Sequence, residues 1–352
     1  MNVNLLFRKN IYDMDSYVPG IQPKDARVIK LNTNENPYPP PSAVIDGLKQ
    51  AIGAQLRLYP DPVCDDLRIA IAKTYGFSKD NIIASNGSDE ILSMIIRAFV
   101  DPGDSVLLMY PTYSLYKVLA IAQSAKIIEC ALTEDFSIPQ TAYSQQAKVC
   151  FVPNPNVPAG NYIDKKNLLR LANTCGGILV IDEAYVDFAE DSCLDLLEDN
   201  KNIIITRTFS KSFSLAGMRI GFAIADESVI KGLMKIKDSY NLNRLSALAG
   251  KIAVENLNEV RSRAQSIKAL RDQTAKQLQS LQFEVLPSQT NFLFARPLQA
   301  TARFIYEKLL SKNILVRFFD QPRVDQYIRV TIGTENEMKI FIETVKQITE
   351  QV

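Results

Sequence analysis

Lys211 stands in an unusual setting for a lysine. It lies in the stretch TRTFSKSFSLAGMRIGF, residues 206–222, between two serines, and the next charged residue toward the C-terminus is Arg219. A lysine on a solvated face usually has charged neighbours, whereas an amine among small polar and apolar residues can be made reactive. The alternative is a surface lysine whose stem covers apolar residues. The stretch predicts a reactive amine at Lys211.

Asp182 stands at the end of an apolar run. The segment ILVIDEAYVDF, residues 178–188, is typical of a buried strand that ends at this acid. Ligands of open α/β sheets bind beyond the carboxyl ends of the strands, and a carboxylate there needs a cationic partner. Tyr185, three residues later, can reach the same pocket. The adjacent acids 182 and 183 are also compatible with a magnesium site for nucleotide hydrolysis, but no Walker-type phosphate loop accompanies them.

An anion site is predicted at residues 85–92, SNGSDEIL. Gly87 and Ser88 lie between a predicted strand and a predicted helix, where free backbone N–H groups bind anions. The alternative is an ordinary helix cap, because serine and aspartate are favoured there. Arg219 is a second anion ligand, or else a structural ion pair. In chain order, these features supply a phosphate site, an acid for a pyridinium, and a lysine for a Schiff base, which is what pyridoxal phosphate requires.

Histidine is absent from the sequence. Its absence excludes Ser-His-Asp and Cys-His nucleophile systems and all histidine metal sites. Acid–base chemistry near neutral pH must then use Lys, Asp, Glu, Tyr or Cys. The cysteines are scattered without a CxxC pair, so we expect reduced, mostly buried thiols in a cytoplasmic protein. They are Cys64, Cys130, Cys150, Cys175 and Cys193.

The composition is that of an ordinary globular protein. The chain has 352 residues, 47% of them hydrophobic, and its 40 basic and 39 acidic residues give a net charge of +1. This balance favours neither nucleic acid nor an anionic membrane surface as a partner. No apolar stretch approaches the roughly 20 residues of a membrane span, and the short apolar run near the start is not typical of a signal peptide.

Short apolar runs alternate with helical patterns between residues 80 and 225. The runs DNIIAS, DSVLLMY, AKIIECAL, KVCFVP, GGILVIDEA, KNIIITRTF and RIGFAIA predict a mostly parallel sheet covered by helices on both faces. From about residue 240 the pattern changes to a long charged helix at 258–282, followed by short strands and two helices at about 298–311 and 335–350. We therefore expect an N-terminal arm over 1–40, a large α/β domain over 41–240 and a small α+β domain over 241–352.

The order of the motifs resembles one known family over nearly the whole chain. The motifs are SYVPG (16–20), LNTNENPYPP (31–40), LYPDP (58–62), NGSDE (86–90), YPTYSLY (110–116), NPNVPAG (154–160), IDEAY (181–185), TFSKSFSLAGMRIGF (208–222) and IRVTIGT (328–334). On these residues the chain resembles the fold-type I pyridoxal-phosphate aminotransferases, and within them the histidinol-phosphate aminotransferases. The resemblance implies a seven-stranded, mostly parallel sheet between helices, with a smaller C-terminal domain.

The resemblance also implies a role for each motif residue. Lys211 resembles the lysine that binds pyridoxal phosphate as a Schiff base, Asp182 the acid paired with its pyridine nitrogen, and Tyr185 the phenol bonded to its ring 3-hydroxyl. Tyr113 resembles the aromatic stacked on the ring. The expected phosphate-binding region comprises Gly87, Ser88, Asp89, Thr208, Ser210 and Arg219.

Other implied contacts concern the substrate and a second subunit. Tyr59 resembles a tyrosine that reaches the cofactor phosphate of the other subunit, which implies a homodimer with shared active sites. The residues that resemble those holding the anionic ends of the substrate are Tyr17, Arg317 and Arg329. The alternative for the two arginines is that they lie on edge strands and only improve solubility. No metal is expected.

Val157 departs from the family pattern. The usual motif NPNNPTG is here NPNVPAG, so valine stands where an asparagine commonly donates to the cofactor's ring oxygen. Losing one hydrogen bond to a charged oxygen costs about 1.5–3 kcal/mol if nothing compensates. Either Tyr185 carries this interaction alone or another donor, such as Asn156, replaces the missing one.

The expected activity is amino transfer between L-histidinol phosphate and 2-oxoglutarate, in histidine biosynthesis. Two alternatives on the same fold are an aromatic or broad-range aminotransferase and a pyridoxal-phosphate-dependent decarboxylase of phosphorylated amino acids. A cofactor-binding transcription regulator would need a further basic domain, for which the chain has no room. A purely structural binding protein would not need Lys211.

Overall fold

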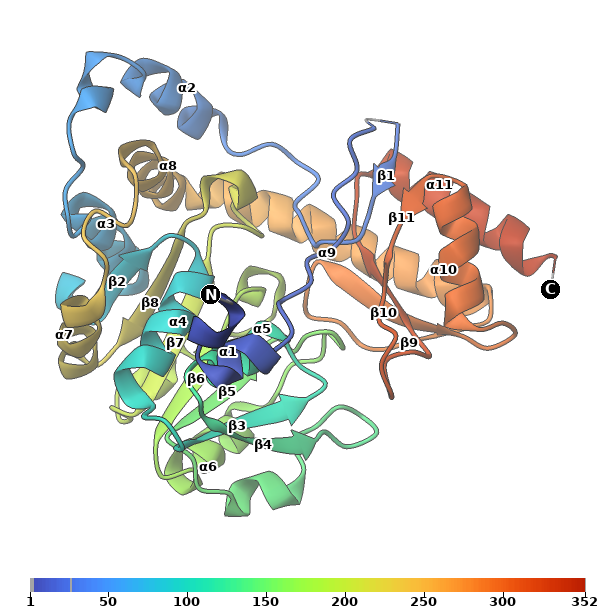
Figure 1. Cartoon of the computed structure of the whole chain (residues 1–352). Helices are drawn as coiled ribbons and strands as arrows, with labels where there is room; N and C mark the ends of the chain where they lie inside the picture. The colour runs from blue at the N-terminus through green and yellow to red at the C-terminus, as the bar shows by residue number, and fades with distance from the viewer. Residues whose placement is uncertain (1–2, 26, 352) are drawn as a thin grey trace.

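The computed structural model describes residues 3–25 and 27–351, which form two lobes (Figure 1). The large lobe is built on a seven-stranded sheet in the order β2-β8-β7-β6-β5-β3-β4. Its strands are β2 (Ile82–Ser85), β3 (Ser105–Tyr110), β4 (Lys126–Ala131), β5 (Val149–Pro153), β6 (Ile178–Asp182), β7 (Ile203–Thr208) and β8 (Gly221–Ala225). Only β8 is antiparallel to its neighbours within this sheet, so the predicted mostly parallel sheet is confirmed.

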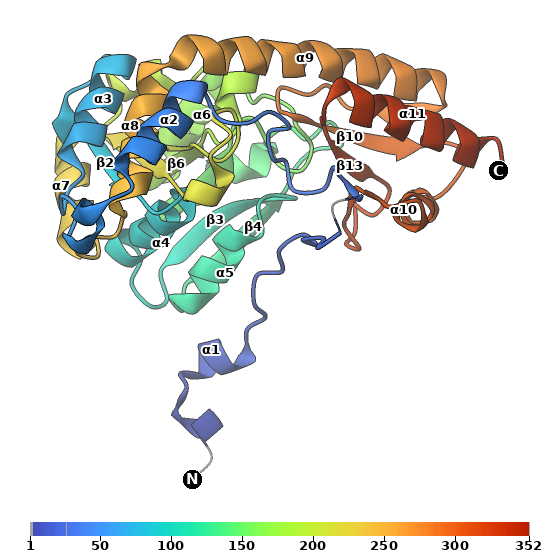
Figure 2. The same ribbon diagram turned by 90° about the horizontal axis from the view of Figure 1, so that it is seen from above.

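Both faces of this sheet are buried, which explains its nearly continuous apolar strands. In β3, Val106 and Leu108 pack with residues of α4 (Ser88–Phe99), α5 (Leu115–Ala122) and α7 (Glu227–Ile236). Leu107 and Met109 alternate with them and pack on the opposite face, where α6 lies. The helices of that second face are α3 (Asp65–Tyr75), α6 (Lys165–Thr174) and α8 (Arg244–Glu255). Figure 2 shows α5 and α3 on opposite sides of the sheet.

The carboxyl ends of five strands meet at one edge of the sheet. Strands β2 to β7 all run in the same direction, and five of them, β2, β3, β5, β6 and β7, lead into the predicted site. They end at Ser85, Tyr110, Pro153, Asp182 and Thr208. The segments that follow these ends contain most of the predicted site residues, and ligand crevices of open α/β sheets lie at this edge.

The small lobe carries an antiparallel sheet in the order β12-β13-β10-β9. Its elements are β9 (Phe283–Val285), β10 (Phe292–Pro297), β12 (Arg317–Phe318), β13 (Ile328–Thr331), α10 (Ala302–Ser311) and α11 (Glu335–Thr349). The long helix α9 (Leu257–Ser280) runs along both lobes (Figure 2). The domain boundary near residue 240 stays a prediction, since α8 still packs on α3 and on α2 (Ser42–Ala51) of the large lobe.

The N-terminal segment is attached to both lobes. Its strand β1 (Ile29–Lys30) pairs in parallel with β11 (Ile314–Leu315) of the small lobe. The apolar run ILVRFF therefore forms two strands and not one, because β11 pairs with β1 while β12 pairs with β13. The short helix α1 (Lys9–Asp13) lies beside α5, where Arg8 Nη2 donates to the carbonyl of Ala122 at 2.8 Å.

Across residues 3–25 and 27–351, every helix is too short or too polar to cross a bilayer.

Candidate active site

A cavity of about 660 Å³ lies at the sheet edge where the five strands end. It is lined by parts of both lobes and of the N-terminal segment. The predicted site residues along its wall are Tyr17, Ser88, Asp89, Tyr113, Asp182, Tyr185, Thr208, Ser210, Lys211, Arg219, Arg317 and Arg329. The fold therefore brings together side chains from motifs that are spread over more than 300 positions of the sequence.

Asp182 is buried with one of its two carboxylate oxygens satisfied. Its Oδ2 accepts a hydrogen bond from Tyr116 Oη at 2.7 Å, whereas Oδ1 has no hydrogen-bond partner among the described residues. Burial raises the pKa of this carboxyl from 3.8 to about 6, against the opposing effect of the Tyr116 hydrogen bond. An unpaired buried oxygen on a cavity wall fits a cationic N–H partner such as a pyridinium. Tyr116 ends the motif YPTYSLY, but sequence reasoning assigned it no role.

The pKa of Asp182 predicts a pH-dependent stability of the cofactor-free protein. The pKa of Asp182 is higher in the folded than in the unfolded protein. The contribution of the neutral acid to the free energy of unfolding is therefore complete below about pH 3.8 and is lost as pH rises through about 6. Between these limits the free energy of unfolding falls by about 3 kcal/mol, which is the equivalent of the pKa shift. We expect Asp182→Asn to remove this loss, so that the variant gains stability relative to the wild type between pH 4 and pH 7. Urea unfolding of both cofactor-free proteins across this range measures the difference, and a difference that does not vary with pH contradicts the prediction.

Lys211 has an amine that is free of ion pairs. Its Nζ donates to the carbonyl of Thr33 at 3.2 Å and lies 5.5 Å from the centre of the Tyr185 ring. Within residues 3–25 and 27–351, no carboxylate lies within ion-pair distance of this amine. Asn36 of the N-terminal segment binds the loop after β7, because its Nδ2 donates to the carbonyls of Lys211 and Ser212 at 3.1 and 3.0 Å. Sequence reasoning identified the lysine but missed Thr33 and Asn36.

A group of donors lies where α4 begins. The helix starts at Ser88, directly after Gly87, whose φ of 83° is readily adopted only by glycine. Strand β8 approaches this start closely, because a Cβ on Gly221 would lie 2.3 Å from the backbone N of Ser88. Two glycines therefore expose the N–H groups of the first turn, which is the arrangement that binds phosphate.

Arg219 completes this group of donors. Its Nη1 donates to Ser210 Oγ at 3.3 Å, and that hydroxyl also receives a hydrogen bond from Thr208 Oγ1 at 3.0 Å. Its Nη2 pairs with Asp89 Oδ2 at 3.1 Å. A Cβ on residue 87 would lie 2.6 Å from Arg219 Nη2, so the glycine also makes room for the guanidinium. The hydroxyls, the helix N–H groups and the guanidinium together fit a phosphate group.

Arg317 and Arg329 lie directly opposite each other on β12 and β13. Arg329 Nη2 donates to the carbonyl of Asn32 at 3.1 Å, while its Nε is buried without a partner among the described residues. Burial lowers the pKa of this guanidinium. Phe319 lies 5.3 Å from both guanidinium carbons. Like charges directly across a strand pair are destabilising, so this pair is suited to an anionic ligand that bridges it.

Two tyrosines, Tyr17 and Tyr113, line the cavity. Tyr113 contacts Tyr17 edge to face at 5.7 Å, and its hydroxyl donates to Asp89 Oδ1 at 3.4 Å. Burial raises the pKa of Tyr113, so its phenol stays neutral. The arrangement leaves an aromatic wall beside the cavity, to which the N-terminal segment contributes through Tyr17.

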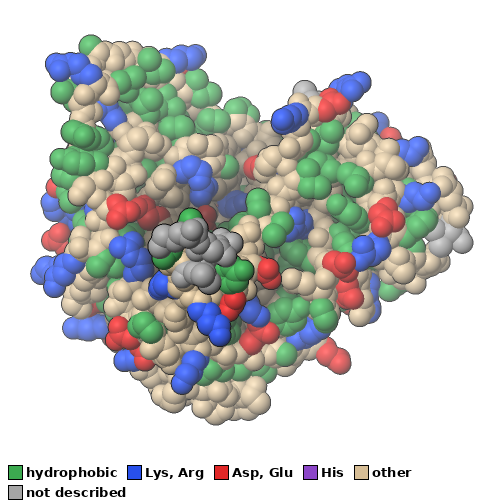
Figure 3. Space-filling model, viewed as in Figure 1, with side chains coloured by type: hydrophobic (Ala, Val, Ile, Leu, Met, Phe, Trp, Pro, Cys, Tyr) green, Lys and Arg blue, Asp and Glu red, His purple; other side chains and the backbone are tan. Residues whose placement is uncertain are grey.

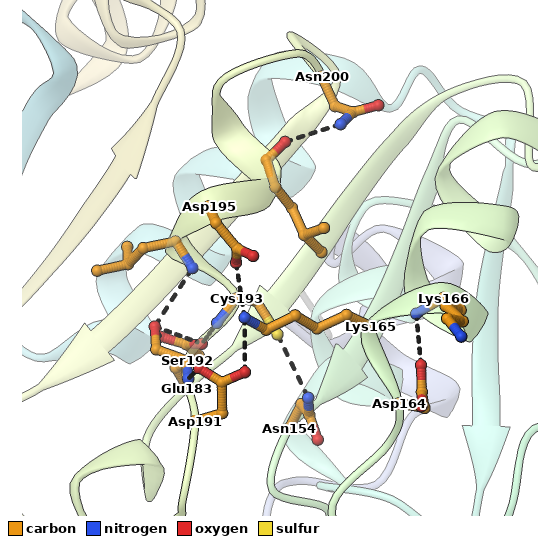
Figure 4. A network of polar contacts seen from close by, with 12 residues as sticks. Asn154, Asp164, Lys165, Lys166, Glu183, Asp191, Ser192, Cys193, Asp195 and Asn200 are labelled. Carbon is orange, nitrogen blue, oxygen red and sulfur yellow. Dashed lines mark hydrogen bonds and ion pairs between the residues drawn. The ribbon is translucent and has the colours of Figure 1, made fainter.

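Glu183 belongs to a separate polar network, although it follows Asp182 in the sequence. Its carboxylate pairs with Arg207 at 2.6 Å and accepts a hydrogen bond from the backbone N–H of Cys193 at 2.5 Å. Figure 4 shows Glu183 beside Ser192 and Cys193, and Glu183 is not among the residues that line the cavity, whereas Asp182 is. The two acids therefore serve different functions, since successive side chains of an extended segment point to opposite faces.

Three predicted site residues do not line the cavity. Gly87 lies behind Arg219, as described above. Asn156 is buried, and its Nδ2 donates to Asn161 Oδ1 at 3.1 Å. Tyr59 is 78% exposed and stacks on Tyr240 with ring centres 4.6 Å apart. Their roles stay predictions.

Comparisons with known proteins show the family of the chain. The model of the family "Aminotransferase class I and II" matches residues 26–345. The histidinol-phosphate aminotransferase 1 of Trichormus variabilis is 41% identical over 344 residues, which cover 97% of this chain and 98% of the relative. The histidinol-phosphate aminotransferase of Geotalea uraniireducens is 42% identical over 342 residues, covering 97% of this chain and 99% of the relative.

Solved structures share the fold at lower sequence identity. The histidinol-phosphate aminotransferase from Sinorhizobium meliloti, in complex with pyridoxal-5'-phosphate, has a TM-score of 0.90 at 23% identity and 98% coverage of both chains. An L-threonine-O-3-phosphate decarboxylase from Porphyromonas gingivalis has a TM-score of 0.81 at 22% identity, covering 92% of this chain and 100% of that chain. The fold therefore occurs with more than one activity, and the sequence relatives are the ones that define the family. The chain belongs to the class I and II aminotransferases and, within them, to the histidinol-phosphate aminotransferase family.

Proposed function

We propose that the protein transfers an amino group between L-histidinol phosphate and 2-oxoglutarate, with pyridoxal phosphate as cofactor, in histidine biosynthesis. The observation that carries this proposal is the convergence in one cavity of Lys211, whose amine bonds only to the Thr33 carbonyl among the described residues, and Asp182, whose Oδ1 has no hydrogen-bond partner there. The paired arginines of the small lobe lie along the same cavity. The choice of substrate follows the names of the sequence relatives.

The residues present fit pyridoxal phosphate. Asp182 would pair with the pyridine nitrogen and Tyr185 would donate to the ring hydroxyl. Arg219, Ser210 and the first turn of α4 would bind the phosphate. When bound, this cofactor supplies an electron sink that acidifies the carbon bearing the substrate's amino group, and a carrier that stores that group between half-reactions.

The protein's own groups then bind substrate and move the proton. Lys211 Nζ is the base that removes the proton from the substrate carbon bearing the amino group, and the Thr33 carbonyl orients this amine. Arg317 and Arg329 bind the phosphate of histidinol phosphate in one half-reaction and a carboxylate of 2-oxoglutarate in the other. One arginine pair can bind both substrates, because a guanidinium forms the same two parallel hydrogen bonds with a phosphate and with a carboxylate.

A single-turnover absorbance experiment tests this function. Purified protein loaded with pyridoxal phosphate is mixed with L-histidinol phosphate in the absence of any oxo acid. We expect the absorption band of the lysine-bound cofactor to disappear and to return when 2-oxoglutarate is added. A response to phenylalanine or tyrosine alone would instead identify an aromatic aminotransferase, and release of carbon dioxide would identify a decarboxylase.

We also propose a homodimer that forms through the large lobe. Hydrophobic side chains gather over α2 and the loop after it (Figure 3). The exposed ones include Ile52, Leu56, Leu58 and Tyr59, and the exposed Tyr240, which precedes α8, stacks on Tyr59. Arg244 Nη2 holds this loop through the carbonyl of Tyr59 at 2.9 Å. An exposed apolar patch on an ordered surface supports a protein–protein interface, across which Tyr59 would reach the cofactor phosphate of the partner subunit.

Tyr59→Phe tests the shared site, because it removes one hydroxyl and leaves the apolar ring. We expect the variant to remain a dimer but to bind pyridoxal phosphate about tenfold more weakly or worse, the effect of losing one hydrogen bond to a charged group. Sedimentation velocity gives the oligomeric state, and absorbance titration gives the affinity. Tyr306→Phe on α10 is the matched control. A monomeric wild type, or an unchanged affinity for Tyr59→Phe, would refute the shared site.

The cysteines support a cytoplasmic location. All five are free and buried in the structure. Free thiols in this number fit a compartment in which thiols are kept reduced.

A further inference from the structure

Asn34 connects the N-terminal segment to the cofactor site. Its side chain is almost completely buried, and its Nδ2 donates to Tyr185 Oη at 2.9 Å. Both residues line the cavity. Asn34 belongs to the motif LNTNENPYPP, to which the sequence alone assigned no chemical role.

The amide of Asn34 is held in one orientation by the small lobe. Thr331 Oγ1 accepts a hydrogen bond from the backbone N–H of Asn34 at 3.0 Å and donates its single hydrogen to Asn34 Oδ1, also at 3.0 Å. Asn291 Nδ2 donates to the carbonyl of Asn34 at 3.1 Å. The φ of Asn34 is 58°, in the left-handed region that asparagine tolerates better than most residues. These contacts leave the amide NH₂, and not its oxygen, directed at Tyr185.

This orientation decides where the hydroxyl hydrogen of Tyr185 points. The phenol oxygen accepts from Asn34, and an NH₂ group cannot accept a hydrogen bond in return. The O–H of Tyr185 is therefore turned away from Asn34, toward other acceptors along the cavity. A hydroxyl that accepts one hydrogen bond is also the stronger donor in the next.

The substitution at Val157 increases the importance of this donor. Valine offers no hydrogen to a ring oxygen, and the amide of Asn156 is already bound to Asn161. We propose that Asn34 is a positioning residue, which turns the Tyr185 hydroxyl toward the ring hydroxyl oxygen of the cofactor and so offsets the donor that Val157 lacks. The inference rests on the proposed function, because it requires pyridoxal phosphate in the cavity.

The test is a spectroscopic pH titration without substrate. A hydrogen bond to the ring oxygen favours its anionic form, so the midpoint pH of the absorption change of the lysine-bound cofactor reports whether Tyr185 donates. Asn34→Asp replaces the donor by an acceptor and turns the hydroxyl of Tyr185 round. We expect it to raise the midpoint by roughly 1 to 2 pH units, as Tyr185→Phe does, which is the equivalent of one hydrogen bond to a charged group.

Asn34→Gly is the neutral companion variant. Glycine adopts a φ of 58° without strain, removes the amide and adds no charge. We expect it to raise the midpoint by less than Asn34→Asp, since the hydroxyl is released but not turned away. This variant also keeps the proposal testable if the buried carboxylate prevents folding. Asn10→Asp, on α1, controls for the change in net charge.

A double-mutant cycle with Tyr185→Phe separates positioning from a general structural effect. If Asn34 acts through Tyr185, then Asn34→Asp and Asn34→Gly shift the midpoint little in the Tyr185→Phe background. The other titratable groups around this contact are Lys211, Asp182 and Arg329, with the Lys30–Glu35 ion pair on the N-terminal segment. Their side chains are the same in every variant, and the Tyr185→Phe background measures any effect of the new carboxylate that does not pass through Tyr185.

Two results would overturn the proposal. One is a midpoint unchanged from the wild type in both Asn34 variants. The other is a shift that keeps its full size in the Tyr185→Phe background, because the amide would then act on the cofactor directly or through space. A wild-type protein that shows no cofactor band at all would refute the proposed function and is distinguishable from both results.

Discussion

Lys211→Ala is expected to lower the rate of amino transfer by roughly 10⁴-fold or more, the upper end of what one positioned proton-transfer group contributes. The side chain has two roles in the proposed chemistry, as the amine that holds the cofactor and as the base that moves the substrate proton. The variant loses both, and no other lysine lines the cavity within the described residues. Steady-state assays with L-histidinol phosphate and 2-oxoglutarate measure the rate, and the absorption band of the lysine-bound cofactor is expected to be absent.

Two further variants make this result specific. Lys211→Arg keeps the positive charge, but a guanidinium stays protonated in proteins and can neither attack a carbonyl nor accept a proton. It is therefore expected to be as inactive as Lys211→Ala. Lys231→Ala on α7 removes an exposed lysine that pairs with Glu227 at 2.8 Å, and its activity is expected to equal that of the wild type. Activity of Lys211→Ala above a tenth of the wild-type value would show that another residue carries the chemistry.

Arg329→Met is expected to lower kcat/KM for L-histidinol phosphate by roughly 10²- to 10³-fold without reducing the stability of the protein. Truncating one partner of a buried, hydrogen-bonded charge pair costs about 3–4 kcal/mol in such cases. The stability behaves differently, because without ligand Arg329 faces Arg317 across the strand pair and has an unsatisfied Nε. Removing one of two opposed like charges relieves repulsion. Urea unfolding without ligand is therefore expected to show equal or higher stability.

The substrate and a neighbouring arginine provide the controls. L-histidinol lacks the phosphate, so Arg329→Met is expected to leave kcat/KM for this compound nearly unchanged, because that constant does not depend on the half-reaction with 2-oxoglutarate. Arg329→Lys keeps the positive charge but cannot form two parallel hydrogen bonds with a phosphate. We therefore expect a smaller decrease in kcat/KM, of about tenfold. Arg296→Met on β10 removes an arginine that pairs with Glu284, outside the cavity, and should leave kcat/KM as it is. A loss of the same size on L-histidinol would contradict a phosphate contact.

The N-terminal segment has a larger part in this site than its extended character suggests. It contributes the carbonyl of Thr33 to Lys211, the amide of Asn36 to the lysine loop and the amide of Asn34 to Tyr185. Strand β1 fixes the same segment to the small lobe through β11. The Lys211 amine, the Tyr185 hydroxyl and the Arg329 guanidinium are thus all bonded to this one segment, which spans both lobes.

The sequence alone determined which chemistry is available and where the strands end. A Gly-Ser helix start, an acid at the end of an apolar run and a lysine without charged neighbours on its C-terminal side are local properties, and their order along the chain predicted the cofactor class. The mostly parallel sheet was predictable for a similar reason, because strands buried on both faces must be apolar along their whole length. The motif resemblance added the role of each residue, including the departure at Val157.

Only the tertiary structure decided which partners orient those groups. Tyr116 is 66 positions from Asp182, and Asn34 is 151 positions from Tyr185, so neither hydrogen bond leaves a local pattern in the sequence. The opposition of Arg317 and Arg329 depends on the register of β12 with β13, and the division of the run ILVRFF depends on β1 arriving from the N-terminal segment. Periodicity records which face of an element is buried, whereas a hydrogen bond between distant residues depends on how the elements pack.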